Sequence, residues 1–383
     1  MTAKNICPRA PVKDSNGVIF GRSGSGKSAA AKLQIMDILE HSENDCVYVV
    51  DVYGEYTHLA EKLHGKVISL SLSPASRTYL NPLDTEMGYG DKPVFGKSFP
   101  ANSSSRVIDP EADPLDMKVD YVISMIGLML GSSQQLDPQT KAVIARCVCL
   151  VYKPYVEQME CLRAEGSDIT CDKSSMPTLA TLYNELRKQP EPEAQMAADV
   201  MECYVEGNFA LFSHCSNVNS DARFMVYNCR MLGEGMAELG MFACLNDIWN
   251  KMVENGRKGL RTWVYIEDMV RQLIYCRPTR QILFNMYGQA QIHHGNMIGI
   301  SGENSDGSMR DVVGAVMPSG FVSIMAVDRS SREILKDSLN LSEEQKRHIT
   351  PDVPPGHGLF CTEEGCRAFT IEPSQEDMEY IRI

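Results

Sequence analysis

The sequence predicts an α/β fold with a mainly parallel β-sheet and an inserted all-α subdomain. Three observations lead to this prediction. First, a glycine-rich loop lies between a strand pattern and a helix pattern near the start of the chain. Second, short apolar runs alternate with helical segments in the first and last parts of the chain. Third, strand patterns nearly vanish in the middle of the chain. We expect residues 1–110 to form the first part of the α/β domain, residues 111–215 the helical insert, and residues 216–383 the second part.

The strand and helix patterns of the first part follow βαβ order. Residues 46–51 form a continuous apolar run of strand length, as expected for a parallel strand that is covered on both faces. Strands are predicted at residues 16–20, 46–51 and 66–72, and helices at residues 28–39 and 56–63. Residues 85–115 are rich in Gly, Pro, Ser and Asp, which predicts a loop.

The middle of the chain is predicted to be helical, and the α/β pattern then returns. The predicted insert helices are residues 116–130, 137–155, 178–187 and 192–205. In the second part, strands are predicted at residues 224–228, 261–268, 296–301 and 320–327, and helices at 238–255, 277–290, 332–339 and 342–348. Residues 358–371 predict a hairpin that turns at Glu364–Gly365.

Composition places the chain among ordinary globular proteins, because 43% of its 383 residues are hydrophobic and 23% are charged. No apolar run approaches the roughly 18 residues of a membrane span, and the N-terminus has no signal-peptide pattern, so a cytoplasmic location is expected. A net charge of −13 disfavours non-specific wrapping of nucleic acid. The thirteen cysteines have no paired C-x-x-C spacing and are expected to be buried, reduced thiols.

The glycine-rich loop GRSGSGKS, residues 21–28, fits the phosphate-binding pattern G-x-x-x-x-G-K-[ST] at every fixed position. Its amide groups can surround an anion, Lys27 can reach the β- and γ-phosphates, and the Ser28 hydroxyl can bind Mg²⁺. The alternative is a Gly/Ser linker that fits by chance, but the strand before it and the helix after it favour the nucleotide site. The predicted nucleotide-binding residues are Gly21, Ser23, Gly24, Ser25, Gly26, Lys27, Ser28 and Ala29.

Hydrolysis needs acids as well as a phosphate loop. The predicted strand that ends at Ile266 is followed by Glu267 and Asp268, which we assign to the metal side and the water side respectively. In many ATPases the order is Asp then Glu, so the pair is reversed here, and the shorter Asp268 reaches less far. A third acid, Glu55, follows another strand and could lie beside the γ-phosphate. The alternatives are acids that end a strand in solvent and, for Glu55, an acid at a helix start.

An ordered set of motifs resembles the C-terminal ATPase domain of the VirB4-type (TraE/TraC-like) ATPases of type IV secretion and conjugation. The set runs through nearly the whole chain, and its order is more specific than the phosphate loop alone. It comprises residues 16–28 (the phosphate loop), DVYGEY at 51–56, YLNPLD at 79–84, LNDIW at 245–249, TWVYIED at 262–268, LSEEQ at 341–345 and PGHGL at 355–359.

The resemblance implies a RecA-like P-loop ATPase domain with an inserted helical subdomain, using ATP and Mg²⁺. It also implies a homo-hexamer in the secretion assembly, with a monomer possible for the isolated chain. The implied partners are inner-membrane components of the type IV secretion system, reached from the cytoplasmic face of the membrane. Full-length members carry a further N-terminal domain, so the chain is expected to be a fragment or a truncated relative.

Several positions depart from the family pattern. The acid pair is reversed, the stretch at residues 286–295 contains no arginine where the family has an Arg-Lys pair, and residues 301–304 read SGEN in place of a Thr-Gln sensor. Arg332 falls near the family's Asp-Arg pair, with Ser331 at the Asp position. Arg332 and Arg329 are therefore the candidates for an arginine finger, against the alternative of surface arginines at a helix start.

Three functions follow from these observations. The first is an ATPase motor that energises conjugative secretion. The second is a nucleotide-binding structural subunit of that apparatus with poor hydrolysis, which the reversed acids and the missing Arg and Gln favour. The third is a DNA translocase of the HerA/FtsK type, against which the net charge of −13 argues weakly.

Overall fold

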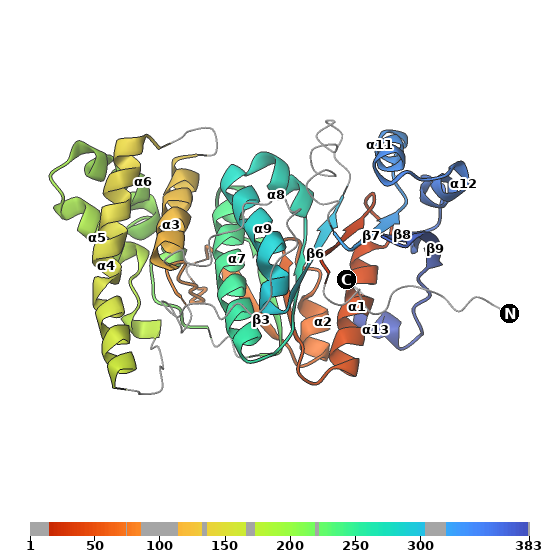
Figure 1. Cartoon of the computed structure of the whole chain (residues 1–383), viewed down its shortest axis with the longest axis horizontal. Coiled ribbons are helices and arrows are strands. Elements are labelled where there is room, and N and C mark those ends of the chain that lie inside the picture. The colour runs from red at the N-terminus through yellow and green to blue at the C-terminus, as the bar shows by residue number, and fades with distance from the viewer. Residues whose placement is uncertain are drawn as a thin grey trace. The chain divides into compact units, whose positions relative to one another are not determined.

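The computed structural model describes residues 15–73, 75–85, 114–131, 136–165, 173–218, 222–302 and 319–381 (Figure 1). The chain divides into two compact units. Unit 1 comprises Met1–Ser69, Asn219–Arg230 and Asn255–Ile383, and unit 2 comprises Leu70–Val218 and Met231–Glu254. The expected helical insert, residues 111–215, falls within unit 2. Most of the loop expected at residues 85–115 lies outside the described residues.

Within the described residues, nine strands form one sheet in the order β3-β4-β2-β5-β6-β1-β7-β8-β9. The strands are β1 (Gly17–Phe20), β2 (Cys46–Asp51), β3 (Lys66–Ser71), β4 (Phe224–Met231), β5 (Thr262–Ile266), β6 (Gly295–Ser301), β7 (Phe321–Met325), β8 (His357–Thr362) and β9 (Gly365–Thr370).

The sheet is parallel from β4 to β7 and antiparallel at the β7–β8–β9 edge. Every residue of β1, β2, β5 and β6 is buried, which agrees with the continuous apolar runs of their sequences. In a parallel sheet all carboxyl ends meet at one edge, and β5 and β1 are separated there only by β6. The phosphate loop and the acid pair therefore follow the same edge.

The core of unit 1 forms where helices pack on this sheet. Its members include Ile19, Val47, Val49, Trp263 and Tyr265. The helices of the unit are α1 (Lys27–His41), α2 (Thr57–Lys62), α8 (Met269–Tyr275), α9 (Arg277–Gln289), η3 (Ala290–His293), α11 (Arg329–Leu339), α12 (Glu343–Lys346), η4 (Arg347–Ile349) and α13 (Asp377–Ile381). Helix α13 packs against α1 and α2, so the C-terminal helix joins the phosphate-loop helix (Figure 1).

The secondary-structure predictions missed two short helices and misplaced one turn. Neither α8 nor α13 was expected, because each is too short to show a helical period in the sequence. The hairpin of β8 and β9 turns at Glu363–Glu364, one residue before the expected position, since Thr362 pairs with Gly365.

Unit 2 is a helical bundle. Helix α4 packs against α3, α5 and α6, and α6 packs against α3 and α5. Its helices are α3 (Pro114–Leu130), α4 (Pro138–Ala164), η1 (Lys173–Ser175), α5 (Leu179–Lys188), α6 (Pro192–Val205), η2 (Ala210–Phe212) and the part of α7 (Glu234–Arg257) up to residue 254. Tyr121 of α3 stacks on Phe242 of α7 with ring centroids 4.5 Å apart.

The YLNPLD motif, residues 79–84, forms a turn that unit 2 holds with buried polar groups. The Asn81 side chain donates to the Asp84 carboxylate (2.7 Å) and to the Pro177 carbonyl (3.0 Å). The buried ammonium of Lys118 donates to the Asp84 carbonyl (2.9 Å) and to Asn246 Oδ1 (3.0 Å). The motif therefore has a structural role in tying α3 and α7 to this turn.

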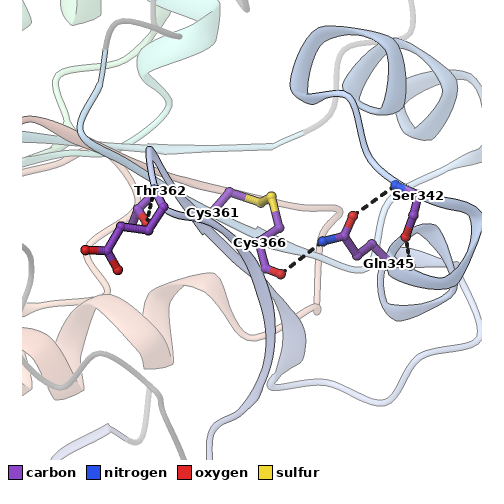
Figure 2. The surroundings of a disulfide bond; sticks show 6 residues. Ser342, Gln345, Cys361, Thr362 and Cys366 are labelled. Carbon is purple, nitrogen blue, oxygen red and sulfur yellow. Dashed lines mark hydrogen bonds between the residues drawn. A yellow bond between two sulfur atoms is a disulfide. The ribbon is translucent and has the colours of Figure 1, made fainter.

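A disulfide joins Cys361 and Cys366, which face each other in the hairpin of β8 and β9 (Figure 2). The expectation of reduced thiols is wrong for this pair, because the hairpin register places the two side chains together. It is also wrong in part on burial, since Cys149, Cys161, Cys203 and Cys215 are exposed and form no disulfide.

The hairpin is tied to α12 as well. Gln345 donates from Nε2 to the Cys366 carbonyl at 3.0 Å, and it closes a capping box with Ser342 (Figure 2). The LSEEQ motif therefore has a structural role, because its Gln345 joins α12 to the hairpin. No helix in the described part of the chain is long and apolar enough to cross a bilayer.

Candidate active site

The phosphate loop connects β1 to α1 and is held by backbone hydrogen bonds from distant segments. The Arg22 amide donates to the Ala326 carbonyl (2.8 Å), and the Gly356 amide donates to the Ser25 carbonyl (2.8 Å). Gly26 has φ 102, and a Cβ on it would lie 2.9 Å from the Gly356 nitrogen, so only glycine fits there. The PGHGL motif, which contains Gly356, thus holds the phosphate loop through this backbone hydrogen bond.

The expected phosphate-binding residues Lys27 and Ser28 lie in the first turn of α1. Lys27 donates from Nζ to the Arg22 carbonyl (2.9 Å), so its side chain folds back over the loop. Ser28 is half-buried in the first turn of α1. Helix α1 begins at Gly26 without a side-chain cap, which leaves its first amide groups suited to phosphate oxygens.

Glu267 is buried directly after β5, with 2% of its surface exposed. Its amide donates to the Val50 carbonyl at 3.1 Å, which fixes it beside the end of β2. Burial raises the pKa of Glu267 to about 9, and the nearby Asp51 and Glu55 raise it further in the same direction. Its Oε2 atom has no hydrogen-bond partner among the described residues, so this oxygen is available to a ligand.

Asp51 organises the DVYGEY loop rather than the nucleotide. Its two carboxylate oxygens accept from the amides of Gly54 (2.6 Å), Glu55 (3.0 Å) and Tyr56 (2.9 Å). This clamp holds Glu55 next to Glu267, and Glu55 Oε2 also has no partner among the described residues. Asp51 is therefore a structural acid that positions the third predicted acid.

Asp268 is less buried than Glu267, because 16% of its side chain is exposed. It has φ 53, a left-handed conformation that is unusual for a non-glycine residue, at the start of α8. Its carboxylate lies 3.9 Å from Arg271 and accepts a hydrogen bond from the hydroxyl of Tyr53. The two neighbouring acids of the predicted pair therefore face different surroundings.

The arginine candidates lie on α11, after β7. Arg329 is exposed at the first position of the helix. Arg332 is 17% exposed, and its Nε lies 4.0 Å from Glu333 Oε1. Among the described residues, the ion pair of Arg332 is with this neighbour on its own helix, not with Glu267, Asp268 or Glu55.

The donor set fits Mg²⁺ that keeps phosphate and water ligands. Glu267 and Glu55 offer oxygens without partners, and Ser28 offers a hydroxyl at the loop. In the described part of the chain, no group of three or more His, Cys, Asp or Glu residues could hold a metal by itself. Mg²⁺ is commonly bound by one or two protein oxygens together with substrate phosphates, so this set suits it.

Three residues of the site were not singled out from the sequence. Tyr53 contacts both acids, with its amide at Glu267 and its hydroxyl at Asp268. Lys32 is buried on α1 and donates to the Ile381 carbonyl at 3.2 Å. Gly356 supports the loop. A lysine between buried Ala31 and Leu33 is the one signal that the sequence offered.

The neighbouring histidines His293 and His294 differ in burial. His294 is exposed, but His293 is half-buried at the end of η3. Burial lowers the pKa of His293 to about 4, and Arg257 adds to this effect. His293 is therefore neutral at physiological pH.

The chain is similar to known proteins in part of its sequence and in its fold. The family described as the central domain of the helicase HerA matches residues 15–194. VirB4 of Thermoanaerobacter pseudethanolicus is similar in structure, with a TM-score of 0.73, 18% identity, and coverage of 95% of this chain and 91% of that chain. No curated protein matches the sequence.

The bacterial conjugative coupling protein TrwBdeltaN70 is also similar. Its unbound monoclinic form gives a TM-score of 0.51 at 12% identity, covering 98% of this chain and 89% of that chain. Its trigonal form in complex with sulphate gives 0.53 at 10% identity, covering 98% and 91%. The chain therefore has the RecA-like P-loop ATPase fold of VirB4 and TrwB, and the resemblance to the VirB4-type ATPases is confirmed in fold.

Proposed function

We propose that the chain is a P-loop ATPase that energises a type IV secretion or conjugation apparatus. One observation carries this proposal: a phosphate loop and a buried carboxylate, Glu267, follow strands of the same sheet edge in a fold that VirB4 shares. The similarity to VirB4 supports the choice of apparatus.

In this proposal the loop amides and Lys27 bind the β- and γ-phosphates of ATP, and Ser28 with Glu267 holds Mg²⁺. The metal neutralises charge on the phosphate oxygens when it is bound. Glu55 or Asp268 orients the attacking water. Because Asp51 fixes the backbone on which Glu55 lies, Glu55 is the better held of the two.

The test is steady-state hydrolysis of MgATP by Lys27→Ala beside the wild type. We expect turnover to fall by about 10²–10³-fold, because a charge that stabilises the transition state is lost. Lys62→Ala, an exposed lysine in the last turn of α2, is the matched control and should retain turnover. Turnover that survives Lys27→Ala would refute the proposal.

A second candidate is a nucleotide-binding structural subunit of the same apparatus with poor hydrolysis. The contacts of Asp268 with Arg271 and Tyr53 favour it, because they already occupy the acid that would orient water. The exchange Glu267→Asp with Asp268→Glu restores the common acid order. A large gain in turnover supports this candidate, and unchanged turnover counts against it.

A third candidate is a DNA translocase, favoured by the match to the central domain of HerA and by the likeness to TrwB. The net charge of −13 weighs against it. Hydrolysis that is stimulated by DNA and declines steeply with salt would place this candidate first.

For the assembly, we propose a homo-hexamer in the secretion complex and a monomer for the isolated chain. Arg332 or Arg329 of one subunit would then act on the nucleotide of its neighbour. The partners would be inner-membrane components of the complex, which would hold the chain at the cytoplasmic face of the membrane. Light scattering with and without MgATP tests the oligomeric state.

A further inference from the structure

The hairpin of β8 and β9 contacts the phosphate loop at the base of the hairpin. The amide of Gly356, the residue before β8, donates to the Ser25 carbonyl at 2.8 Å. The carbonyl of Gly356 accepts from the amide of Ile371, the residue after β9, also at 2.8 Å. Gly356 is therefore held between the phosphate loop and the end of the hairpin, so the position of the hairpin sets the position of this support.

The backbone around Gly356 leaves little room for a shift. Gly356 is buried and has φ 84, a conformation that residues with a side chain rarely adopt. A Cβ on Gly26 would lie 2.9 Å from the Gly356 nitrogen, and a Cβ on Gly358 would lie 2.1 Å from the carbonyl oxygen of Ile324 in β7. A change in the register of β8 would therefore displace the amide that holds Ser25.

The turn of this hairpin is not of a kind that fixes the register by itself. It consists of Glu363 and Glu364, two exposed residues of like charge. Two-residue hairpin turns favour pairs such as Asn-Gly, Asp-Gly and Gly-Gly, whose backbones readily adopt positive φ. The register of β8 against β9 therefore depends on contacts outside the turn.

The disulfide supplies such a contact. Cys361 and Cys366 face each other in the second residue pair from the turn, and the bond between them prevents β8 from sliding along β9 (Figure 2). The hydrogen bond from Gln345 to the Cys366 carbonyl joins β9 to α12 and not to β8. Nine other cysteines in the described part of the chain form no disulfide, so the hairpin register selects this pair.

The bond is accessible to reductants from the side of β9. Cys361 is only 3% exposed, whereas Cys366 is half-buried on β9, the strand at the end of the sheet order. A thiol reductant attacks Sγ of Cys366 and forms a mixed disulfide, and Cys361 leaves as a thiolate that takes a proton. A second reductant thiol releases Cys366 as a thiol, and the reductant departs as a disulfide. The chain gains two electrons and two protons, which the two reductant thiols supply.

We propose that Cys361 and Cys366 form a redox switch for nucleotide binding. The disulfide form holds Gly356 against the phosphate loop, and the dithiol form frees the hairpin from this register. The switch rests on nucleotide binding at the loop, which belongs to the proposed function. A bond that closes so short a loop adds little to global stability, so its reduction loosens the hairpin without unfolding the chain. The oxidised form binds more tightly because its loop is already ordered.

The first test is calorimetry of MgADP binding to the oxidised and the dithiothreitol-reduced wild type. We expect Kd to rise about 3–10-fold on reduction, because the binding energy must then order the loop support as well. The double change Cys361→Ala with Cys366→Ala should bind as the reduced wild type does, with or without dithiothreitol. The exposed Cys149→Ser is the control and should respond to dithiothreitol as the wild type does. Equal Kd in both states of the wild type, or tighter binding after reduction, would overturn the proposal.

The second test uses the reciprocity of linked equilibria. If the disulfide favours the nucleotide, the nucleotide favours the disulfide by the same factor. At a fixed ratio of oxidised to reduced glutathione, saturating MgADP should therefore raise the ratio of disulfide to dithiol chains by about 3–10-fold. Alkylation followed by mass spectrometry of the peptide that contains Cys361 and Cys366 measures this ratio. A ratio that does not respond to MgADP would contradict the switch.

The third test needs neither nucleotide nor a variant. Amide hydrogen exchange of the wild type is compared before and after reduction, and we expect faster exchange in residues 21–28 and 355–360, with β2 unchanged as the internal control. Unchanged exchange in both segments, or unfolding of the reduced chain, would overturn the proposal. If neither redox state binds MgADP, the proposed function fails instead, and the exchange measurement still decides whether the disulfide holds the loop.

Discussion

Two buried lysines, one in each unit, show how differently the chain uses a buried charge. Lys32 of unit 1 and Lys118 of unit 2 are 1% and 5% exposed. Lys118 donates to a carbonyl and to an asparagine side chain at the turn formed by residues 79–84. Lys32 donates to the carbonyl of Ile381, and its ammonium lies 5.5 Å from the centroid of the Tyr56 ring.

The neighbours of the two lysines account for the difference. Around Lys118, amide groups of Asn81, Asn246 and Asn250 fill the hydrogen bonds of the turn. Burial raises the pKa of Asp84 there, which favours the uncharged acid. Among the acids of unit 1, Oε2 of Glu55 and Oε2 of Glu267 have no partner in the described part of the chain, and in unit 2 the same holds for Oδ2 of Asp84. Each unit therefore keeps a buried carboxylate oxygen unused, and the two units differ in the amide groups that hold the turn around Asp84.

The largest expected effect is on stability and concerns Asp51. It tests whether a carboxyl group with a structural role can be distinguished from the other acids of unit 1. Asp51 belongs to the carboxyl cluster, but it accepts from three backbone amides, as a structural group does. We expect Asp51→Ala to lower the free energy of unfolding by roughly 3–5 kcal/mol, because buried amides lose their acceptors. Urea unfolding without nucleotide measures it. Asp51→Asn keeps one acceptor and should lose less; an equal loss would contradict this reading.

The next effect concerns Lys118. Lys118→Met should destabilise unit 2 by about 2–4 kcal/mol, since the Asp84 carbonyl and Asn246 lose a charged donor. Urea unfolding and limited proteolysis measure the loss. MgATP hydrolysis per folded molecule should stay near the wild-type value, because Lys118 belongs to unit 2 and the phosphate loop to unit 1. Lost turnover in a fully folded Lys118→Met protein would break the comparison.

Glu267 gives a prediction with a pH signature. Its pKa is raised to about 9 by burial and by Asp51 and Glu55, so the folded state binds this proton more tightly than the unfolded state, in which the usual value is near 4.5. Stability from this group is therefore full below about pH 4.5 and falls as pH rises toward 9. Glu267→Gln should stabilise the metal-free chain by roughly 1–3 kcal/mol at pH 8 and by little at pH 5.

Thermal unfolding in EDTA across this pH range measures the effect, and MgATP turnover of Glu267→Gln should fall in parallel. Asp268→Asn is the control, because Asp268 lies outside the buried cluster and its change should leave Tm almost unaltered. A Glu267→Gln protein that is less stable than the wild type at pH 8 would show that the carboxylate is better satisfied than we describe.

The smallest effect is expected at the disulfide. Cys361 and Cys366 are separated by only 5 residues and already face each other in a hairpin, so the bond closes a very short loop. Reduction, or the double change Cys361→Ala with Cys366→Ala, should cost no more than about 1–2 kcal/mol. Thermal unfolding with and without dithiothreitol measures it. The exposed Cys149→Ser is the control, and a collapse of Tm on reduction would contradict the prediction.

The sequence predicted the parts of the fold that depend on local pattern. The apolar runs of β1, β2 and β5 and the spacing of the helices in unit 2 were sufficient to identify those elements, and the order of motifs identified the fold. The contacts between distant segments could not be predicted in this way. That Gly356 supports Ser25, or that the carbonyl of Ile381 meets Lys32, depends on packing that no local pattern records.

The candidate site was predictable to the same extent. The sequence named Glu267, Asp268 and Glu55, but not how their side chains differ. The left-handed backbone of Asp268 has no sequence signal, because aspartate rarely adopts it and the glycine that usually marks it is missing. Asp51 was included only as the first residue of the DVYGEY motif, and its role in holding the backbone of that loop became visible only with its three hydrogen bonds.

The position of β1 in the middle of the sheet has a consequence for how the protein is made. Strand β1 pairs with β6 and β7, and Ser25 contacts Met325, 300 residues later in the chain. During synthesis the first strand therefore leaves the ribosome long before either of its neighbours exists. The apolar side chains of β1 therefore stay without their neighbours until β6 and β7 have been synthesised. We expect the sheet to form late and cooperatively, and the growing polypeptide to need chaperones.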